Sequence, residues 1–148
     1  MKVLELKNSS FDRDAVIKLL ENNTCFVAVF SQSCIHCINM KPAWNNLKKN
    51  LKKMKSNSVV LEIDASQLDY INYGPLKNSI RGFPAIMIFK NGKMFKDYAG
   101  NRTTPEMLKF FKPHVEKATK KTIKKKKPVD KKTKARKMKL SRRIKLLY

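Results

Sequence analysis

The chain has 148 residues, a formal net charge of +23 and three cysteines. This length suits a single domain with an adequate hydrophobic core. No run of the sequence approaches the roughly 18 apolar residues that a membrane-spanning helix needs, so we expect no transmembrane segment. Residues 1–7 are too short and too charged for a secretory signal peptide. We therefore expect a cytoplasmic, nuclear or virion location and a protein that is not secreted.

The positive charge is concentrated at one end of the chain. Residues 117–148 contain sixteen Lys or Arg and one acid, Asp130, which gives +15, whereas residues 1–116 contain eighteen basic and ten acidic residues, which gives +8. Like charges repel and bury nothing, so a segment of this composition is expected to be extended when free. We predict a folded domain over residues 1–116 and a separate basic C-terminal tail over residues 117–148.

The first half of the chain predicts two strands and two helices. Residues 3–6 alternate weakly and indicate a short strand, and residues 12–22 place apolar side chains on one face of a helix, with Ser9 or Ser10 as its cap. Residues 26–30 are a continuous apolar run, typical of a central strand that is buried on both faces. A long helix follows and ends near Ser56 and Asn57. Its many lysines, between residues 48 and 55, are expected to form its solvated face.

The second half predicts three further strands. Residues 59–64 form a buried strand, and residues 68–76 a short helical region interrupted at Gly74 and Pro75. Asn91-Gly92 is a strong hairpin signal that joins strands 86–89 and 94–98. A last helix begins near Thr104, with Pro105 in its first turn. This order predicts an α/β fold with a mixed sheet of four to five strands and helices on both faces.

Two cysteines lie between the central strand and the long helix. In the first turn of a helix, unsatisfied N–H groups and the macrodipole would stabilise a thiolate at Cys34, the form that attacks disulfides. Cys37 lies three residues later on the same helical face, close enough for a disulfide. We predict that Cys34 is the attacking thiol and Cys37 the resolving thiol. His36 between them can place positive charge beside Cys34 and so favour the reduced form.

Other roles for these cysteines are open. They could be half of a zinc site completed by His36, His114 or Cys25, but the sequence contains no second C-x-x-C and no spaced histidine pair. They could also be buried thiols without chemistry. A strand, a C-x-x-C and a helix in this order favour redox chemistry, with no metal and no cofactor. Cys25, at the start of a buried strand, is expected to contribute to packing, with a third redox-active thiol as the alternative.

The motif Cys34-Ile35-His36-Cys37 resembles the active site of the thioredoxin family, and it is closer to the CGHC of protein disulfide isomerase domains than to CGPC. Pro42 lies where the family kinks this helix, and residues 43–47 are similar to the stretch that follows in isomerase domains. Residues 80–85 resemble the V-R-G-x-P-T segment, and residues 86–93 the strand and hairpin after it. The resemblance covers about residues 1–116. It implies a three-layer fold, a cis proline at Pro84 that faces the disulfide, and substrate pairing with the exposed backbone of Phe83.

Several positions depart from the family pattern. Ser33 replaces the usual Trp before the first cysteine, and Ala28 replaces the buried acid that accepts a proton from the resolving thiol. Glu62 stands where a Lys commonly pairs with that acid, so Glu62 is the candidate substitute acceptor. The mobile arginine of isomerase domains corresponds to Arg102, one residue late; its alternative is a solvated loop charge.

The basic tail has a physical interpretation of its own. Neutralised phosphates release counterions, so a polyanion, with nucleic acid foremost, is the expected partner. An acidic protein surface or an anionic membrane is the alternative, and residues 138–148 have the spacing of a short amphipathic helix. A solvated tail without a partner is also open.

Two functions follow from these observations. The first is a thiol-disulfide oxidoreductase, of the oxidase or isomerase kind, that acts on protein thiols and disulfides and is attached through its tail. The second is a structural or interaction component of a large nucleoprotein or viral particle that keeps the fold as a building block. The histidine between two cysteines favours the first.

Overall fold

The computed structural model describes residues 1–118 and contains one five-stranded sheet in the order β1-β3-β2-β4-β5. The β1, β2 and β3 strands are parallel, and β4 runs antiparallel to β2 and to β5. This mixed sheet confirms the expected architecture. The strands are β1 (Lys2–Leu6), β2 (Cys25–Phe30), β3 (Val59–Asp64), β4 (Ala85–Lys90) and β5 (Lys93–Asp97).

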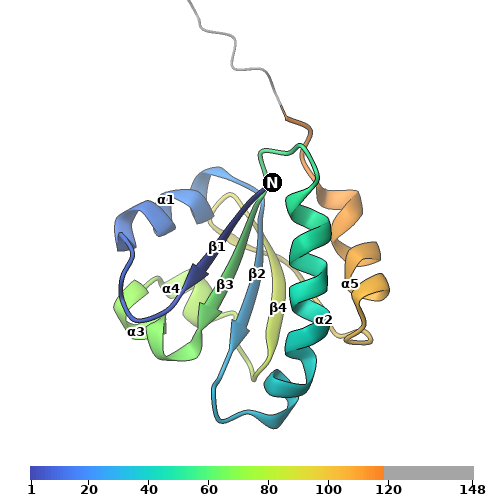
Figure 1. The fold of residues 1–148 in the computed structure, drawn as a ribbon. Helices are drawn as coiled ribbons and strands as arrows, with labels where there is room; N and C mark the ends of the chain where they lie inside the picture. Colours follow the sequence, from blue (N-terminus) through green and yellow to red (C-terminus); the bar gives the residue numbers. More distant parts are fainter. Residues whose placement is uncertain (119–148) are drawn as a thin grey trace, which may run out of the picture.

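Helices cover both faces of the sheet, which gives three layers (Figure 1). The α1, α3 and α4 helices lie on one face, and α2 and α5 lie side by side on the other. Short 3-10 turns, η1 and η2, extend two of these segments. The bounds are α1 (Arg13–Asn22), α2 (Ile35–Lys52), η1 (Ala65–Gln67), α3 (Leu68–Ile71), α4 (Gly74–Lys77), α5 (Thr104–Phe111) and η2 (Lys112–His114). None of the helices in residues 1–118 combines the length and the apolar character needed to cross a bilayer.

Each face of the sheet packs its own hydrophobic cluster. All six residues of β2 are buried, so alternate side chains feed the two clusters, as expected for a central strand. Trp44 of α2 is fully buried and contacts Phe30 and Phe111 edge-on. This packing fixes α2 rigidly against β2, and the cysteine pair lies at the junction of these two elements.

Local details differ from the sequence expectation at three places. Asp12, and neither Ser9 nor Ser10, caps α1, because its carboxylate accepts hydrogen bonds from the N–H groups of Asp14 and Ala15. Ser9 has a positive φ of 48° and instead contacts Gln67 through its hydroxyl. Gly74 and Pro75 begin α4 and do not interrupt a helix.

The third difference concerns the lysines of α2. The Lys48 side chain is 11% exposed and is paired with Glu5 and Glu62, so it does not belong to a solvated face.

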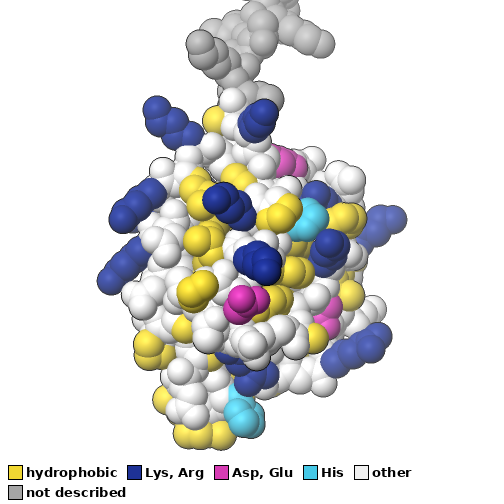
Figure 2. Space-filling model, turned by 90° about the vertical axis from the view of Figure 1, so that its right-hand side faces the viewer, with side chains coloured by type: hydrophobic (Ala, Val, Ile, Leu, Met, Phe, Trp, Pro, Cys, Tyr) yellow, Lys and Arg dark blue, Asp and Glu magenta, His cyan; other side chains and the backbone are white. Residues whose placement is uncertain are grey.

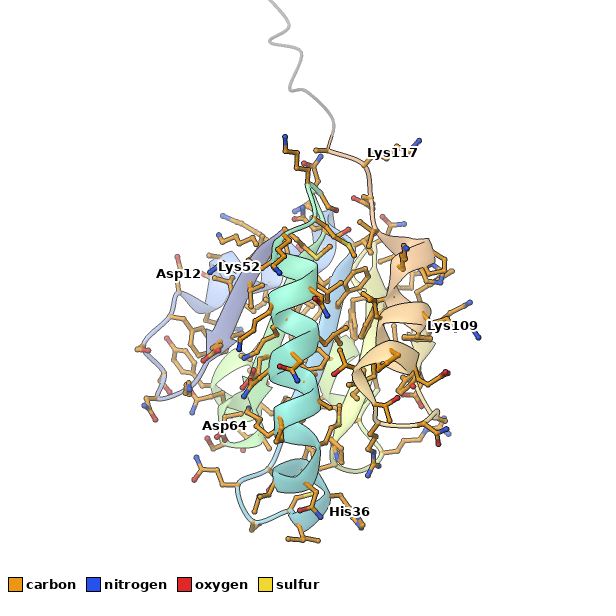
Figure 3. All side chains as sticks on the ribbon, turned by 45° about the vertical axis from the view of Figure 1, so that its right-hand side comes forward. Asp12, His36, Lys52, Asp64, Lys109 and Lys117 are labelled. Carbon is orange, nitrogen blue, oxygen red and sulfur yellow. The ribbon has the colours of Figure 1, made fainter. Side chains whose placement is uncertain are left out.

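The last described residues are fixed to the end of the sheet remote from the cysteines. Glu116 makes three of these contacts. Its carboxylate accepts a hydrogen bond from the Thr24 hydroxyl and its carbonyl accepts one from the Ser56 hydroxyl. The backbone N–H of Glu116 donates to the Ser58 hydroxyl. Lys117 forms an isolated bridge with Ser56. Figure 3 shows Lys117 and Lys52 at one end of the molecule and His36 at the other. The predicted tail from residue 119 onward, including residues 138–148, lies outside the described residues.

Candidate active site

The structure places Cys34 directly before α2, as its N-cap residue. The Cys34 sulfur accepts a hydrogen bond from the backbone N–H of Cys37, with 3.2 Å between N and S. It also lies 3.5 Å from the carbonyl oxygen of Phe83, to which its thiol can donate. Cys34 is half-buried, whereas Cys37 is only 3% exposed. The two thiols are therefore adjacent, and Cys34 is the one that a substrate can reach.

The environment shifts the pKa values of the two thiols in opposite directions. The pKa of Cys34 is lowered, first by the hydrogen bond from the Cys37 side chain and then by the backbone N–H groups of Cys37 and His36 and the charge of Arg102. Burial raises the pKa of Cys37 to about 11, and the hydrogen bond to Cys34 adds to this. Cys34 is thus the readily formed thiolate and Cys37 holds its proton, which is the order of roles that an attacking and a resolving thiol need.

Pro84 lies beside this pair. The Phe83-Pro84 peptide bond is cis, as the resemblance implied, and Phe83 is 37% exposed. Pro84 also lines a cavity of about 310 Å³ with residues of the loop after β5. The full set of lining residues is Pro84, Ile86, Tyr98, Ala99, Gly100, Asn101 and Arg102. The structure therefore brings Phe83, Pro84 and Arg102 to one side of Cys34.

Arg102 is exposed, yet it is not a remote loop charge. Its guanidinium lowers the pKa of both Cys34 and Cys37 by through-space attraction for the thiolates. The loop that carries it is held by the Tyr98 hydroxyl, which donates to the carbonyl of Asn101. The structure thus brings Arg102 within electrostatic reach of the cysteines.

The side chain of His36 behaves differently from the expectation. It is exposed at the end of the molecule (Figure 3), and within residues 1–118 no hydrogen bond joins its ring to either sulfur. Its contribution to Cys34 comes from its backbone N–H. The stabilisation of the Cys34 thiolate therefore comes first from the Cys37 side chain and then from the backbone at the helix start, and the His36 ring faces solvent.

Glu62 is buried beneath α2 at the centre of a polar cluster. Its carboxylate accepts a hydrogen bond from the Trp44 indole N–H at 3.0 Å and pairs with Lys41 and Lys48. Lys48 also binds Glu5 at 2.7 Å. Burial alone would lower the pKa of Lys48, but its bonds to Glu5 and Glu62 outweigh this and raise that pKa. The Glu62 carboxylate therefore has three hydrogen-bond donors around it.

Lys41 connects this polar cluster with the cysteines. It lies one helical turn after Cys37, and its ammonium lies 4.4 Å from the Phe30 ring centroid. A cavity of about 250 Å³ beside it is lined by Phe30, Ser31, Gln32, Cys37, Ile38, Lys41 and Asp64. A second cavity of about 180 Å³ is lined by Glu5, Leu6, Lys7, Phe30, Gln32, Lys41, Glu62 and Asp64. Lys41 thus lines both cavities, the one beside Cys37 and the one beside Glu62.

Sequence reasoning missed Lys41 and Lys48. The signal was present, because Lys41 follows Cys37 by four residues and Lys48 follows Lys41 by seven, which places all three on one helical face. What the sequence did not show is that this face lies over Glu62.

The remaining cysteine has no part in the site. Cys25 is fully buried in β2, and its thiol donates to the carbonyl of Leu19 at 3.3 Å. Burial raises its pKa to about 12. It packs the core, as predicted. Within residues 1–118 no cluster of three or more His, Cys, Asp or Glu is arranged to hold a metal ion.

Comparison with known proteins agrees with this geometry. The Thioredoxin family model matches residues 2–113. A thioredoxin domain-containing protein of Theileria parva is 34% identical over 87 residues, which are 59% of this chain and 37% of that protein. Human protein disulfide-isomerase A6 is 33% identical over 109 residues, which are 72% of this chain and 23% of that protein. The chain therefore spans well under two-thirds of either relative.

Solved structures show the same fold. The first thioredoxin domain of mouse protein disulfide-isomerase A4 superposes with a TM-score of 0.57 at 23% identity, over 86% of this chain and 85% of that one. The order of the elements, the C-x-x-C at the start of α2 and the cis proline before β4 coincide with a family match over most of the chain. On these grounds, the chain belongs to the thioredoxin family.

Proposed function

We propose that this protein is a thiol-disulfide oxidoreductase that acts on polypeptide disulfides through Cys34 and Cys37. The observation that carries the proposal is the position of Cys34, whose sulfur caps α2 and is paired with a buried, protonated Cys37. Family membership supports the same chemistry.

The reaction has two exchange steps. The Cys34 thiolate attacks one sulfur of a substrate disulfide, which forms a mixed disulfide and releases the other substrate sulfur as a thiolate. Cys37 then loses its proton and attacks the Cys34 sulfur, which forms the Cys34-Cys37 disulfide and releases the second substrate thiolate. Two electrons have passed from the enzyme to the substrate. The reverse sequence oxidises a substrate dithiol.

The surface around Cys34 favours polypeptide substrates. Ile35 is 60% exposed, Ile38 56% and Phe83 37%, so Cys34 is surrounded by apolar side chains that no other part of residues 1–118 covers. An apolar segment next to a substrate cysteine would bury this surface on binding. Pairing with the backbone of Phe83 would align the main chain without reading a particular sequence.

We assign Glu62 and Lys41 to the release of the Cys37 proton. The cavity lined by Cys37, Lys41 and Asp64 has room for water, which can accept the proton. Glu62 holds Lys41 in place through their ion pair. In this proposal Glu62 is a positioning residue for Lys41. It lies on β3, in register with Ala28 of β2, where the buried acid is absent.

The basic tail, residues 117–148, is proposed to attach the enzyme to a polyanion, with nucleic acid foremost. The support is its formal charge of +15. The chain leaves the described domain at the end remote from His36, as Figure 3 shows, so a partner bound there would leave the cysteines accessible. A cytoplasmic, nuclear or virion location is part of the same proposal.

The direct test is the reduction potential of the Cys34-Cys37 pair in glutathione buffers, with disulfide exchange measured on the same sample. We expect a reversible disulfide near the roughly −180 mV of the isomerase, because stabilising the Cys34 thiolate favours the reduced form. Exchange no faster than that of a free thiol would refute the oxidoreductase. The protein would then be a structural component of a nucleoprotein or viral particle. The replacement of the buried β2 acid by Ala28 would be the sequence feature that accompanies the loss of catalysis.

A further inference from the structure

A row of aromatic rings crosses the surface between the end of α5 and the edge strand β5. The rings of Tyr98 and Phe110 are 4.8 Å apart, Phe110 lies 6.5 Å from His114, and His114 lies 5.4 Å from Phe95. Phe95, at the outer end of this row, is 50% exposed. The packing of each ring against the next fixes the orientation of Phe95 before any partner binds.

Two lysines lie beside the exposed end of this row. The ammonium of Lys90 lies 4.5 Å from the Phe95 ring centroid and that of Lys96 lies 6.0 Å from it. Lys93 on β5 and Lys112 on η2 are exposed nearby in the sequence. We name the four rings and these four lysines the basic-aromatic surface. Figure 2 shows a histidine surrounded by Lys or Arg and by hydrophobic side chains on this face.

The lysines of this surface lack the carboxylate partners found elsewhere. Across residues 1–118, ion pairs hold Lys7, Lys41, Lys48 and Lys77, but none joins a lysine of the basic-aromatic surface to an acid. The acids of the adjoining elements, Asp97 and Glu106, are both exposed. Burial, followed by the charges of Lys90 and Lys96, lowers the pKa of His114. The surface therefore presents unneutralised positive charge beside rings that stay uncharged at neutral pH.

This combination selects among anionic partners. An acidic peptide or an anionic membrane would be attracted by the lysines alone and would have no need of oriented rings. Single-stranded nucleic acid needs both, because its phosphates take cations and its bases stack on aromatic faces. We propose that the basic-aromatic surface binds single-stranded nucleic acid, with Phe95 stacking on a base and Lys90 and Lys96 contacting phosphates.

This binding takes place away from the cysteines, at the end of the row that carries Phe95 and His114. The η2 turn, which carries His114, follows the end of α5 that is remote from the cysteines (Figure 1), whereas Tyr98, at the inner end of the row, lines the cavity beside Pro84 and Arg102. The binding is also distinct from phosphate binding by the tail, because stacking requires bases and charge attraction does not.

The test uses the full chain and two labelled strands of about twelve nucleotides, oligo(dT) and an abasic strand of the same length, in fluorescence anisotropy. We expect the protein to bind oligo(dT) more tightly than the abasic strand by roughly 5- to 150-fold, the range of one stacked base. Phe95→Leu, which keeps an apolar side chain without a ring, should bring that ratio close to one.

Charge variants complete the experiment. The double change Lys90→Gln and Lys96→Gln should weaken binding to both strands. It should also reduce the slope of log affinity against log salt concentration by about 1.4, the value for two single-strand phosphates. The matched control is Lys49→Gln with Lys53→Gln, two exposed lysines at the end of α2 and at its C-cap. It removes the same charge and should leave this slope nearer to that of the unchanged protein.

Two results would overturn the proposal. One is an equal affinity of the unchanged protein for the oligo(dT) and abasic strands, which would reduce the interaction to phosphate binding. The other is a Phe95→Leu protein that keeps the full preference for oligo(dT). If poly-glutamate also displaced both strands equally and Phe95→Leu had no effect, the surface would be one for acidic proteins.

Discussion

Glu62 on β3 is paired in register with Ala28 on β2, so the buried carboxylate beneath α2 is supplied by the strand next to the central one. Its partners Lys41 and Lys48 both come from α2, the helix that carries the cysteines. The charge cluster therefore joins β3 to the active-site helix, and its loss should affect both stability and the second step of disulfide exchange.

Glu62→Gln should lower the free energy of unfolding by about 1–3 kcal/mol, because Lys48 is nearly buried and would lose one of its two acidic partners. Urea denaturation of the reduced protein measures this. The matched control is Glu5→Gln, which removes the half-exposed partner of Lys48 and should cost less than about 1 kcal/mol. Equal losses in the two variants would contradict the central place given to Glu62. Single-turnover resolution of a mixed disulfide should also slow in Glu62→Gln.

Cys34→Ser should abolish disulfide exchange, whereas Cys37→Ser should trap mixed disulfides with substrates. The reason is that Cys34 is the accessible, more acidic thiol and Cys37 is the buried one that must release the substrate. Non-reducing electrophoresis after quenching with an alkylating agent detects the trapped species. Cys25→Ala serves as the control and should keep exchange intact. Turnover that survives in Cys34→Ser would remove the catalytic assignment.

Arg102→Gln should move the pH midpoint of Cys34 alkylation upward. The thiolate reacts, and its fraction falls as the pH drops through the Cys34 pKa; the Arg102 charge lowers that pKa, so its removal shifts the fall to higher pH. The rate of reaction with iodoacetamide, measured against pH, reports the midpoint. Lys18→Gln on the exposed side of α1 removes an equal charge far from the site and should leave it unchanged. An unmoved midpoint in Arg102→Gln would make this residue a solvated loop charge.

Ile35→Ser should raise KM for a disulfide-bonded polypeptide several-fold and leave exchange with a small disulfide unaffected. Its side chain is 60% exposed beside Cys34, so it can add apolar contact with a bound chain without taking part in the chemistry. Steady-state kinetics with both substrates measure the difference. Met94→Ser, an exposed apolar residue of β5, is the control. Equal KM increases for both substrates would indicate a disturbed cysteine pair instead.

Removal of residues 119–148 should spare exchange with small substrates and strongly reduce salt-sensitive retention on phosphate-rich polymers. The cut belongs after Ala118, because Glu116 and Lys117 are fixed to Ser56 and Thr24 and an earlier cut would disturb the domain. Retention on a DNA column at increasing salt, with circular dichroism to verify folding, measures the effect. Unchanged retention would place the polyanion site within the folded part.

The sequence by itself determined the order and type of the main elements. The unbroken apolar run at 26–30, the Asn91-Gly92 turn and the Pro105 helix start all act through local backbone preferences and periodicity, which need no tertiary context. The adjacency of Cys34 and Cys37 is equally local, since three residues at the start of a helix fix it.

The tertiary structure alone decided how distant charges meet. From the sequence, Lys48 is expected to be one of a series of solvated lysines. Only the packing of α2 across β3 and β1 places it between Glu62 and Glu5. The reach of Arg102 to the cysteines and the row of rings ending at Phe95 depend on the same kind of long-range placement. Local propensity specifies which backbone a segment adopts, whereas ion pairs and ring contacts between segments form only after the two sheet faces have been covered.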